Sequence, residues 1–241
     1  MTPLVIIPAR TGSKGVPNKN FQPLYGLTLV ERAVECAVDA GLSNIAISTD
    51  AKAEWWPPPP ARRWARPPAL AGDTAPMLEV VKDVLRFFDG DPVVLLQPSS
   101  PLRTPQHLRE VLELLPGVDS VVSVCEIPQV YSPDLVWRIG GAGLLQPFIT
   151  LAPPCARRQD ARRAYVRDGT VYAFWRRNVE VDDTLYGARC LPFVIPPEES
   201  LSIDTPEDWT RAEQIIWAQH QRVLEAMKLW PEDKTPPTAG N

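Results

Sequence analysis

Short apolar runs, separated by polar loops, recur along the chain. Leu4–Ile7 and Val93–Leu96 are continuously apolar, which is typical of strands buried on both faces of a sheet. Asn44–Ser48 alternates between polar and apolar residues and predicts another strand. Val118–Val124 and Val171–Trp175 are further strand candidates. The chain therefore holds at least five predicted strands, the first of which lies at the N-terminal end.

Amphipathic stretches lie between these runs. Apolar residues recur at helical spacing from Leu29 until Gly41, which is a good C-terminal stop. A second helix fits Ala75–Phe88. A third starts with Thr104 as N-cap and Pro105 in the first helical position. The order strand, loop, helix, strand implies a right-handed crossover, so we predict an α/β fold with a mostly parallel, Rossmann-like sheet and flanking helices.

The second half of the chain is less regular. Gly140–Gly143 predicts a turn between two short strands. Residues 204–208, DTPED, form another helix start, and this helix extends to about Trp217 or beyond. The polar, proline-rich residues 229–241 are typical of a flexible tail. We expect one domain over residues 1–228, followed by that tail.

Composition narrows the classes of partner. With 241 residues and 44% apolar content, the chain can bury the core of one α/β domain. A net charge of -4 gives no global attraction to nucleic acid or to an anionic membrane. No apolar run approaches the roughly 20 residues of a membrane helix, and no basic leader precedes the first strand. We therefore expect a cytoplasmic protein that binds neither nucleic acid nor membrane.

The cysteines give no sign of a zinc site or of a disulfide framework. The four cysteines are far apart and form no CxxC pair, so each is expected to be a small apolar filler: Cys36, Cys125, Cys155 and Cys190. Glu54–Pro60, EWWPPPP, predicts a stiff polyproline spacer capped by aromatics, with a proline-rich partner ligand as the alternative. His107 and His220 lie on predicted helices away from every motif, and we expect both at the surface.

The loop after the first strand holds the most distinctive chemistry. Its glycines, Gly12 and Gly15, fit neither the Walker spacing nor the dinucleotide fingerprint. However, ligands of parallel sheets lie beyond the carboxyl ends of strands, which is where this loop begins. The glycines let backbone N–H groups approach an anion, and Arg10, Lys14 and Lys19 supply charge. We expect this loop to bind a triphosphate. The alternative is that it is a solvated basic turn.

Six sequence elements, in one order, carry a resemblance to a known family. The segment IPARTGSKG with NKN (residues 7–20) resembles the opening motif of the acylneuraminate cytidylyltransferases, the CMP-sialic acid synthetases. The other elements similar to that family are RP with LAGDT (66–74), LQPSSPLR (96–103), Arg158-Gln159, DGTVY (168–172) and SIDTPED (202–208). The resemblance covers residues 4 to about 217 and implies a nucleotide-diphospho-sugar transferase type of fold.

The resemblance implies a reaction and a set of site residues. In this family the anomeric hydroxyl of a 2-keto sugar acid attacks the α-phosphate of CTP, which gives a CMP-sugar and pyrophosphate. Arg10, Lys19 and Asp204 are the implied catalytic residues. The implied nucleotide site adds Ala9, Gly12, Ser13, Asn20, Arg66 and Thr74. The implied acceptor site comprises Gln97, Ser99, Arg158, Gln159 and Tyr172.

Asp204 is the implied ligand of Mg²⁺ or another divalent cation. Magnesium prefers one or two carboxylates together with phosphates and waters. The alternative role for Asp204 is the N-cap of the last helix, although Thr205 can cap instead. Ser202 stands where the family usually has a first aspartate, and Ser99 stands where KDO-specific relatives have one. The second carboxylate is therefore missing from both places.

Further departures leave the acceptor open. Asp168 replaces the usual Asn and would repel a carboxylate unless it is paired with an arginine. The expected acceptor is a sialic-acid-like sugar acid, and the alternatives are a KDO-type acid or a phosphonate. A further alternative is that the protein is a catalytically silent nucleotide-binding module. Family members are commonly homodimers in which a protruding segment reaches the partner's sugar pocket. Residues 130–163 are the expected counterpart here.

Overall fold

The computed structural model describes residues 2–52, 54–149, 155 and 157–228. The expected tail, 229–241, lies outside this part of the chain. Across the part that is described, no helix is both long enough and apolar enough to cross a membrane.

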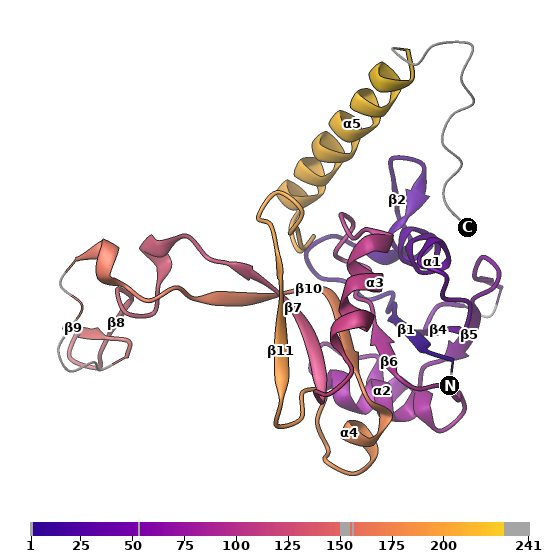
Figure 1. Cartoon of the computed structure of the whole chain (residues 1–241), viewed down its shortest axis with the longest axis horizontal. Helices are drawn as coiled ribbons and strands as arrows, with labels where there is room; N and C mark the ends of the chain where they lie inside the picture. Colours follow the sequence, from indigo (N-terminus) through magenta and orange to yellow (C-terminus); the bar gives the residue numbers. More distant parts are fainter. Residues whose placement is uncertain (1, 53, 150–154, 156, 229–241) are drawn as a thin grey trace.

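A seven-stranded sheet forms the centre of the molecule (Figure 1), in the order β11-β7-β10-β6-β1-β4-β5. Its strands are β1 Leu4–Pro8, β4 Ile45–Thr49, β5 Arg62–Ala65, β6 Val93–Leu95, β7 Ser120–Glu126, β10 Tyr165–Phe174 and β11 Cys190–Ile195. β10 runs antiparallel to its neighbours β6 and β7, and the other pairs are parallel. The α/β fold with a mostly parallel sheet is confirmed.

Helices cover both faces of the sheet. They are α1 Leu29–Asp39, α2 Met77–Leu85, α3 Pro105–Leu114 and α4 Arg176–Glu180. The last helix, α5 Pro206–Lys228, packs with Leu24 and Leu29 at its start and extends away from the sheet (Figure 1). Val5 and Ile7 of β1 pack in one core cluster with residues of α1 and α3. Leu4 and Ile6 pack in a second cluster with residues of α2 and α4. This arrangement explains why the run from 4 to 7 is apolar at every position, since both of its faces are buried.

The helix starts follow local capping rules. Thr28 caps α1 in a capping box with Glu31. Thr104 accepts a hydrogen bond from the His107 backbone, and Pro105 occupies the first turn of α3, as predicted. α2 begins only at Met77, after Pro76, and is shorter than the expected 75–88.

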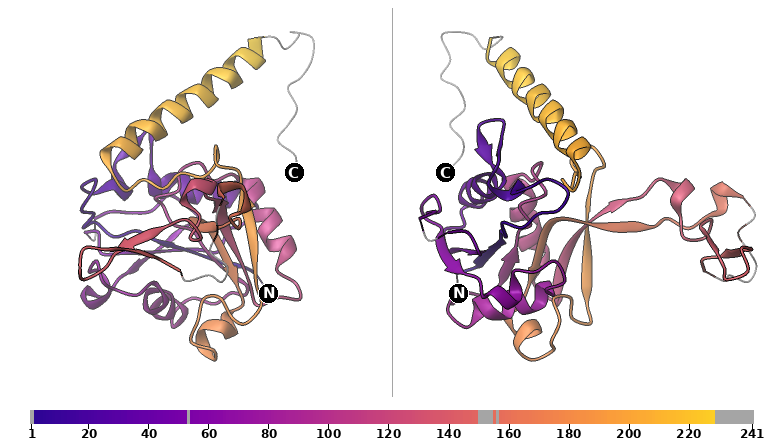
Figure 2. Two further views of the ribbon diagram at one scale, coloured as in Figure 1. Left: turned by 90° about the vertical axis from the view of Figure 1, so that its left-hand side faces the viewer. Right: turned by 180° about the vertical axis from the view of Figure 1, so that it is seen from behind.

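A long arm leaves the sheet (Figures 1 and 2). β7 and β10 pair beyond the core, and between them lies the hairpin of β8 (Trp137–Ile139) and β9 (Leu145–Pro147). Its turn at residues 140–143 was predicted, and Gly143 has a positive φ of 73°. Three-residue helices, η3 Gln129–Tyr131 and η4 Arg158–Asp160, contact one another in the arm. The remaining elements are η1 Lys19–Phe21, η2 Pro68–Leu70 and the hairpin of β2 (Pro23–Leu24) with β3 (Leu27–Thr28).

Some expectations at single residues were wrong. His107 is buried. Its ring forms a hydrogen bond with Glu199 at 2.8 Å and takes part in capping its own helix. His220 is exposed, as expected, and contacts the Tyr25 ring. Cys36 is a buried filler, but Cys190 is exposed on the outer strand β11. In the proline-rich run Glu54–Pro60, the Trp55 ring packs edge-on against Phe21, with the ring centroids 5.1 Å apart. This contact within the chain fits the predicted spacer capped by aromatics.

Candidate functional site

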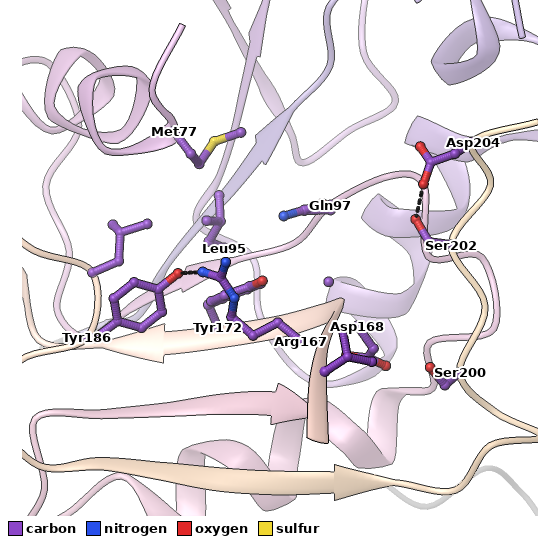
Figure 3. A pocket seen from close by; sticks show the side chains of 13 residues that line it. Met77, Leu95, Gln97, Arg167, Asp168, Tyr172, Tyr186, Ser200, Ser202 and Asp204 are labelled. Atoms are coloured by element: carbon purple, nitrogen blue, oxygen red, sulfur yellow. Dashed lines mark hydrogen bonds between the residues drawn. The ribbon is translucent and has the colours of Figure 1, made fainter. Parts of the chain in front are cut away.

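Two adjoining cavities lie beyond the carboxyl ends of the central strands. The first, the loop cavity, has a volume of about 470 Å³ and is lined by the loop after β1, Arg66, Asp73 and the residues after β6. The second, the β10 cavity, has a volume of about 500 Å³ and lies against β10 (Figure 3). Met77, Gln97 and Asp204 line both. The two cavities therefore form one site with two compartments.

The loop after β1 is held by contacts from three directions. Thr11 donates from its backbone N and its Oγ1 to the Asp50 carboxylate, at 2.8 and 2.9 Å. The buried Asn20 amide donates to the Arg10 carbonyl at 2.9 Å. Gly15 lies directly against the backbone carbonyl of Asp204, so a Cβ at this position would collide with it. These contacts fix the loop beside the chain that leads into α5.

The loop cations are paired with two carboxylates. Arg10 and Lys14 both bind Asp73, the latter at 2.6 Å, and these hydrogen bonds hold the pKa of Asp73 below its usual range. Lys19 Nζ donates to Asp204 at 2.8 Å and to the Ile203 carbonyl. Asp73 received no role from the sequence, although it lies in the quoted LAGDT element. Its partnership with two loop cations is visible only in three dimensions.

Arg66 forms the inner wall of the loop cavity. Its side chain is buried, and it donates to Ser48 Oγ at 3.1 Å and to the Ser48 carbonyl at 2.8 Å. Burial lowers the pKa of Arg66 from its ordinary value. The guanidinium therefore presents a fixed positive charge at the carboxyl end of β4 and β5.

Asp204 lies at the junction of the two cavities. Thr205, not Asp204, is the N-cap of α5, because Asp208 N donates to Thr205 Oγ1 at 3.2 Å and the Asp208 carboxylate accepts from Thr205 N at 2.9 Å. The Asp204 carboxylate instead accepts from Lys19 and, at 3.1 Å, from Ser202 Oγ. Its side chain is 69% exposed, so it is accessible to a ligand in either compartment.

An irregularity in β10 shapes the second compartment. The pairing of β10 with β7 shifts between Arg167 and Tyr172, and Gly169 in the shifted segment has a positive φ of 79°. The nearly buried Asp168 carboxylate accepts from Thr170 N at 3.1 Å and from Thr170 Oγ1 at 2.7 Å. Asp168 is thus occupied with its own turn. These bonds leave its negative charge in place. Among the described residues no arginine forms an ion pair with Asp168, although the buried Arg103 is near enough for the two charges to attract.

Arg103 links this turn to the strand end of β6. The buried guanidinium donates to the Gln97 carbonyl at 2.6 Å and to the Thr170 carbonyl. Burial lowers the pKa of Arg103 to about 10. Arg103 lies in the quoted LQPSSPLR element but received no role from the sequence, because its carbonyl partners are 6 and 67 residues away.

Most, but not all, of the expected site residues meet here. The loop cavity is lined by Arg10, Ser13, Lys19, Asn20, Arg66, Gln97, Ser99 and Asp204, and the β10 cavity by Gln97, Tyr172 and Asp204. Three expected nucleotide residues line neither cavity: Ala9, Gly12 and Thr74. Ala9 is buried, and its N–H donates to the Ser48 carbonyl at 2.9 Å within the sheet.

Arg158 and Gln159 lie elsewhere. Both belong to η4 in the arm, where they are exposed, and they line neither cavity of their own chain. Their expected role as acceptor contacts stays a prediction, and it requires the arm to approach a site on another copy.

Comparisons with known proteins identify the family of this chain. A family model described as cytidylyltransferase matches residues 4–117. CMP-N,N'-diacetyllegionaminic acid synthase of Legionella pneumophila is 31% identical over 230 residues, covering 88% of this chain and 95% of that protein. The chain belongs to the acylneuraminate cytidylyltransferase family. N-acylneuraminate cytidylyltransferases of Streptococcus agalactiae serotype V and Danio rerio are 31% and 32% identical to it over 87% and 88% of its length.

This cytidylyltransferase family member spans about half the length of those last two relatives, 52% and 50%. Solved structures agree with the fold. CMP:2-keto-3-deoxy-manno-octonic acid synthetase complexed with CTP superimposes with a TM-score of 0.63 at 17% identity, covering 91% of this chain and all of that one. 4-Diphosphocytidyl-2C-methyl-D-erythritol synthase of Anaerococcus prevotii gives 0.59 at 12% identity, covering 90% and 96%. The nucleotidyltransferase type of fold expected from the motifs is confirmed.

Proposed function

We propose that the protein transfers CMP from CTP to the anomeric hydroxyl of a sialic-acid-like 2-keto sugar acid and releases pyrophosphate. The observation that carries this proposal is the joined pair of cavities: one holds the cationic loop, the other is open beside β10, and Asp204 and Gln97 line both. The names of the relatives support CTP as donor and a sugar acid as acceptor.

In this proposal the loop cavity takes the nucleotide. Arg10, Lys14 and Lys19 exchange their carboxylate partners for triphosphate oxygens, because charge-assisted bonds to phosphate are among the strongest that a protein makes. Arg66 and Asn20, on the inner wall, are placed for the ribose and base. In this proposal the ion-paired side chains of the loop bind the phosphates, and Arg66 and Asn20, which are buried, bind the nucleoside.

The chemistry is an in-line phosphoryl transfer. The acceptor oxygen forms a bond to the α-phosphorus as the bond from that phosphorus to the bridging β-phosphate oxygen breaks. Pyrophosphate leaves, and the hydroxyl proton passes to solvent water. Negative charge spreads over the phosphoryl oxygens, so positioning and electrostatic stabilisation supply most of the catalysis. Lys19 and Arg10 supply that stabilisation from the loop, and Gln97 orients the acceptor at the shared wall.

The site suits a magnesium ion that is shared with the substrate. Among the described residues no group of three or more His, Cys, Asp and Glu side chains gathers to hold a metal without help. Asp204 offers a single exposed carboxylate at the cavity proposed for the phosphates. One carboxylate is enough for Mg²⁺ when phosphates and waters complete the coordination shell of the ion. When bound, the metal would neutralise charge on the phosphates, and Asp204 would hold it, with the Ser202 hydroxyl beside it.

A homodimer is part of the proposal. The arm exposes large apolar side chains that its own chain leaves uncovered: Tyr131, Trp137, Ile139, Leu144, Leu145 and Phe148. An exposed apolar set of this kind favours a protein partner. We propose in addition that the arm of one copy carries its exposed Arg158 and Gln159 to the β10 cavity of the other. A cytoplasmic location stays a prediction from the sequence.

Pyrophosphate release from CTP and Mg²⁺ tests the proposal. The acceptor panel contains N-acetylneuraminic acid, N,N'-diacetyllegionaminic acid, 2-keto-3-deoxy-manno-octonic acid and a phosphonate. We expect turnover on a nonulosonic acid, and we expect Asp204→Asn and Arg10→Ala to lower it at least 100-fold while leaving the circular dichroism spectrum unchanged. Asp89→Asn, an exposed carboxylate outside both cavities, is the matched control.

The outcomes separate the alternatives. CTP binding without turnover on any acceptor would identify a silent nucleotide-binding module. Turnover restricted to the octonic acid or the phosphonate would move the acceptor to those classes. Near-normal turnover in Asp204→Asn would show that the metal assignment is wrong.

A further inference from the structure

The charges that line the β10 cavity are uneven. Two carboxylates are present. Asp168 accepts hydrogen bonds from Thr170 and keeps its negative charge, with the buried Arg103 guanidinium near it, whereas Asp204 is paired with Lys19 and accepts from Ser202. Among the described residues that line the cavity, Arg167 is the single cation. An anionic ligand in this compartment therefore finds one positive side chain within it.

Arg167 is held at one nitrogen. Its Nη1 donates to the Tyr186 hydroxyl, and its guanidinium carbon lies 5.4 Å from the centroid of the Tyr186 ring (Figure 3). Within the part of the chain that the structure describes, Nε and Nη2 donate no hydrogen bond, and no carboxylate forms an ion pair with Arg167. The guanidinium is thus oriented by an aromatic partner while most of its donors are unused.

The backbone places Arg167 at a defined point. It is the last residue of β10 to pair with β7, opposite Val124, before the register shifts. Asp168 and Gly169 then turn toward Gln97. Arg167 consequently lies on regular sheet, one residue before the irregular turn that forms the floor of the cavity.

We propose that Arg167, oriented by Tyr186, binds the carboxylate of the acceptor and thereby selects acids over neutral sugars. This proposal rests on the proposed CMP transfer. A guanidinium whose Nε and Nη2 donate to no described residue offers two neighbouring donors that match the two oxygens of a carboxylate, and such charge-assisted pairs are strong and geometrically specific. Lysine would offer a point charge without that fork.

This role differs from the one expected for Arg158 and Gln159. Those residues lie in the arm and line neither cavity of their own chain, whereas Arg167 lies within the compartment that its own chain forms. Acid recognition by Arg167 therefore does not depend on whether a second copy delivers its arm.

The test compares each sugar acid of the panel with its methyl ester, which lacks the negative charge. For the wild type we expect the kcat/KM of the acid to exceed that of the ester at least 30-fold, as loss of one charge-assisted bidentate pair predicts. In Arg167→Met we expect this ratio to fall to within about 3-fold of unity, through the acceptor KM. The affinity for CTP, measured by calorimetry, should stay within about 2-fold of the wild type.

Further variants sharpen the result. Arg167→Lys should restore part of the preference, and Tyr186→Phe, which keeps the ring but removes the hydroxyl, should lower it by about 3- to 10-fold. Arg86→Met, an exposed arginine outside both cavities, should leave it unchanged.

Each contrary outcome has a distinct meaning. An Arg167→Met enzyme that still prefers acids, or a wild type that uses acid and ester equally, overturns the assignment of Arg167 alone. A wild type that binds CTP but transfers CMP to no acceptor overturns the proposed function, and the assignment falls with it.

Discussion

Gly15 is the point at which the loop after β1 touches the chain before α5. A methyl group there meets the Asp204 carbonyl, whereas a methyl group at Gly12 meets no atom within 4 Å. We expect Gly15→Ala to lower the free energy of unfolding by about 1–3 kcal/mol, the usual cost of overpacking, and to weaken CTP binding. Gly12→Ala should change stability by less than about 0.5 kcal/mol. Denaturant unfolding measures both, and equal stabilities would contradict the expected contact.

For single residues, the sequence predicted the charged side chains of the site better than it predicted the partners that hold those side chains in place. Arg10, Lys19 and Asp204 were predicted from the motifs and lie together. Asp73, Arg103 and Arg167 were not assigned, because their importance comes from partners that are distant in the sequence. The sequence alone shows which charged residues a site contains, whereas the pairs that these residues form depend on the folded structure.

Among the elements, the arm depends on one buried carboxylate. The Asp134 side chain is 4% exposed and accepts from Arg162 N at 2.9 Å and from the Arg162 guanidinium at 2.6 Å, which lowers the pKa of Asp134 to about 2. Because the pKa is lowered in the fold, the pair stabilises the arm fully above pH 4 and loses this effect as the pH falls toward 2.

We expect Asp134→Asn to loosen the arm at neutral pH. Amide hydrogen exchange in residues 129–131 and 158–160 should quicken several-fold, while exchange in β1 and β6 should not change. Asp160→Asn, which removes a carboxylate 3.7 Å from Arg157 with both side chains largely exposed, is the control. Identical exchange in Asp134→Asn and the wild type would show that the pair does not hold the arm.

Elements with strong local signals were predicted, and elements that depend on neighbours were not. β1, β6, α1 and α3 followed from apolar periodicity, caps and stops. β5 (RRWA) and β11 (CLPFVI) lie at the two edges of the sheet, and their residues are only partly buried. β5 has no apolar run, and Pro192 interrupts the apolar run of β11, which weakens its strand signal. The length of β10 also exceeded the expectation, since its outer half belongs to the arm.

For the whole molecule, the exposed apolar hairpin predicts self-association. Ile139 is 77% exposed on β8 and Leu145 is 68% exposed on β9. We expect sedimentation to show a dimer, and we expect Ile139→Asp and Leu145→Asp to weaken it at least 10-fold. Val181→Asp, which changes an equally exposed residue just after α4, should leave the mass unchanged. A wild-type monomer, or variants that remain dimers, would contradict this expectation.

The pairing of the loop cations has one more consequence. In the free protein Asp73 and Asp204 act as counter-ions to Arg10, Lys14 and Lys19, so two of these three positive charges are already compensated. A small anion competes with the two carboxylates for the same side chains and gains little. A polyanion can displace several counter-ions at once, so the site sets a charge threshold. Discrimination against orthophosphate in favour of nucleoside triphosphates then begins before any base or sugar is recognised.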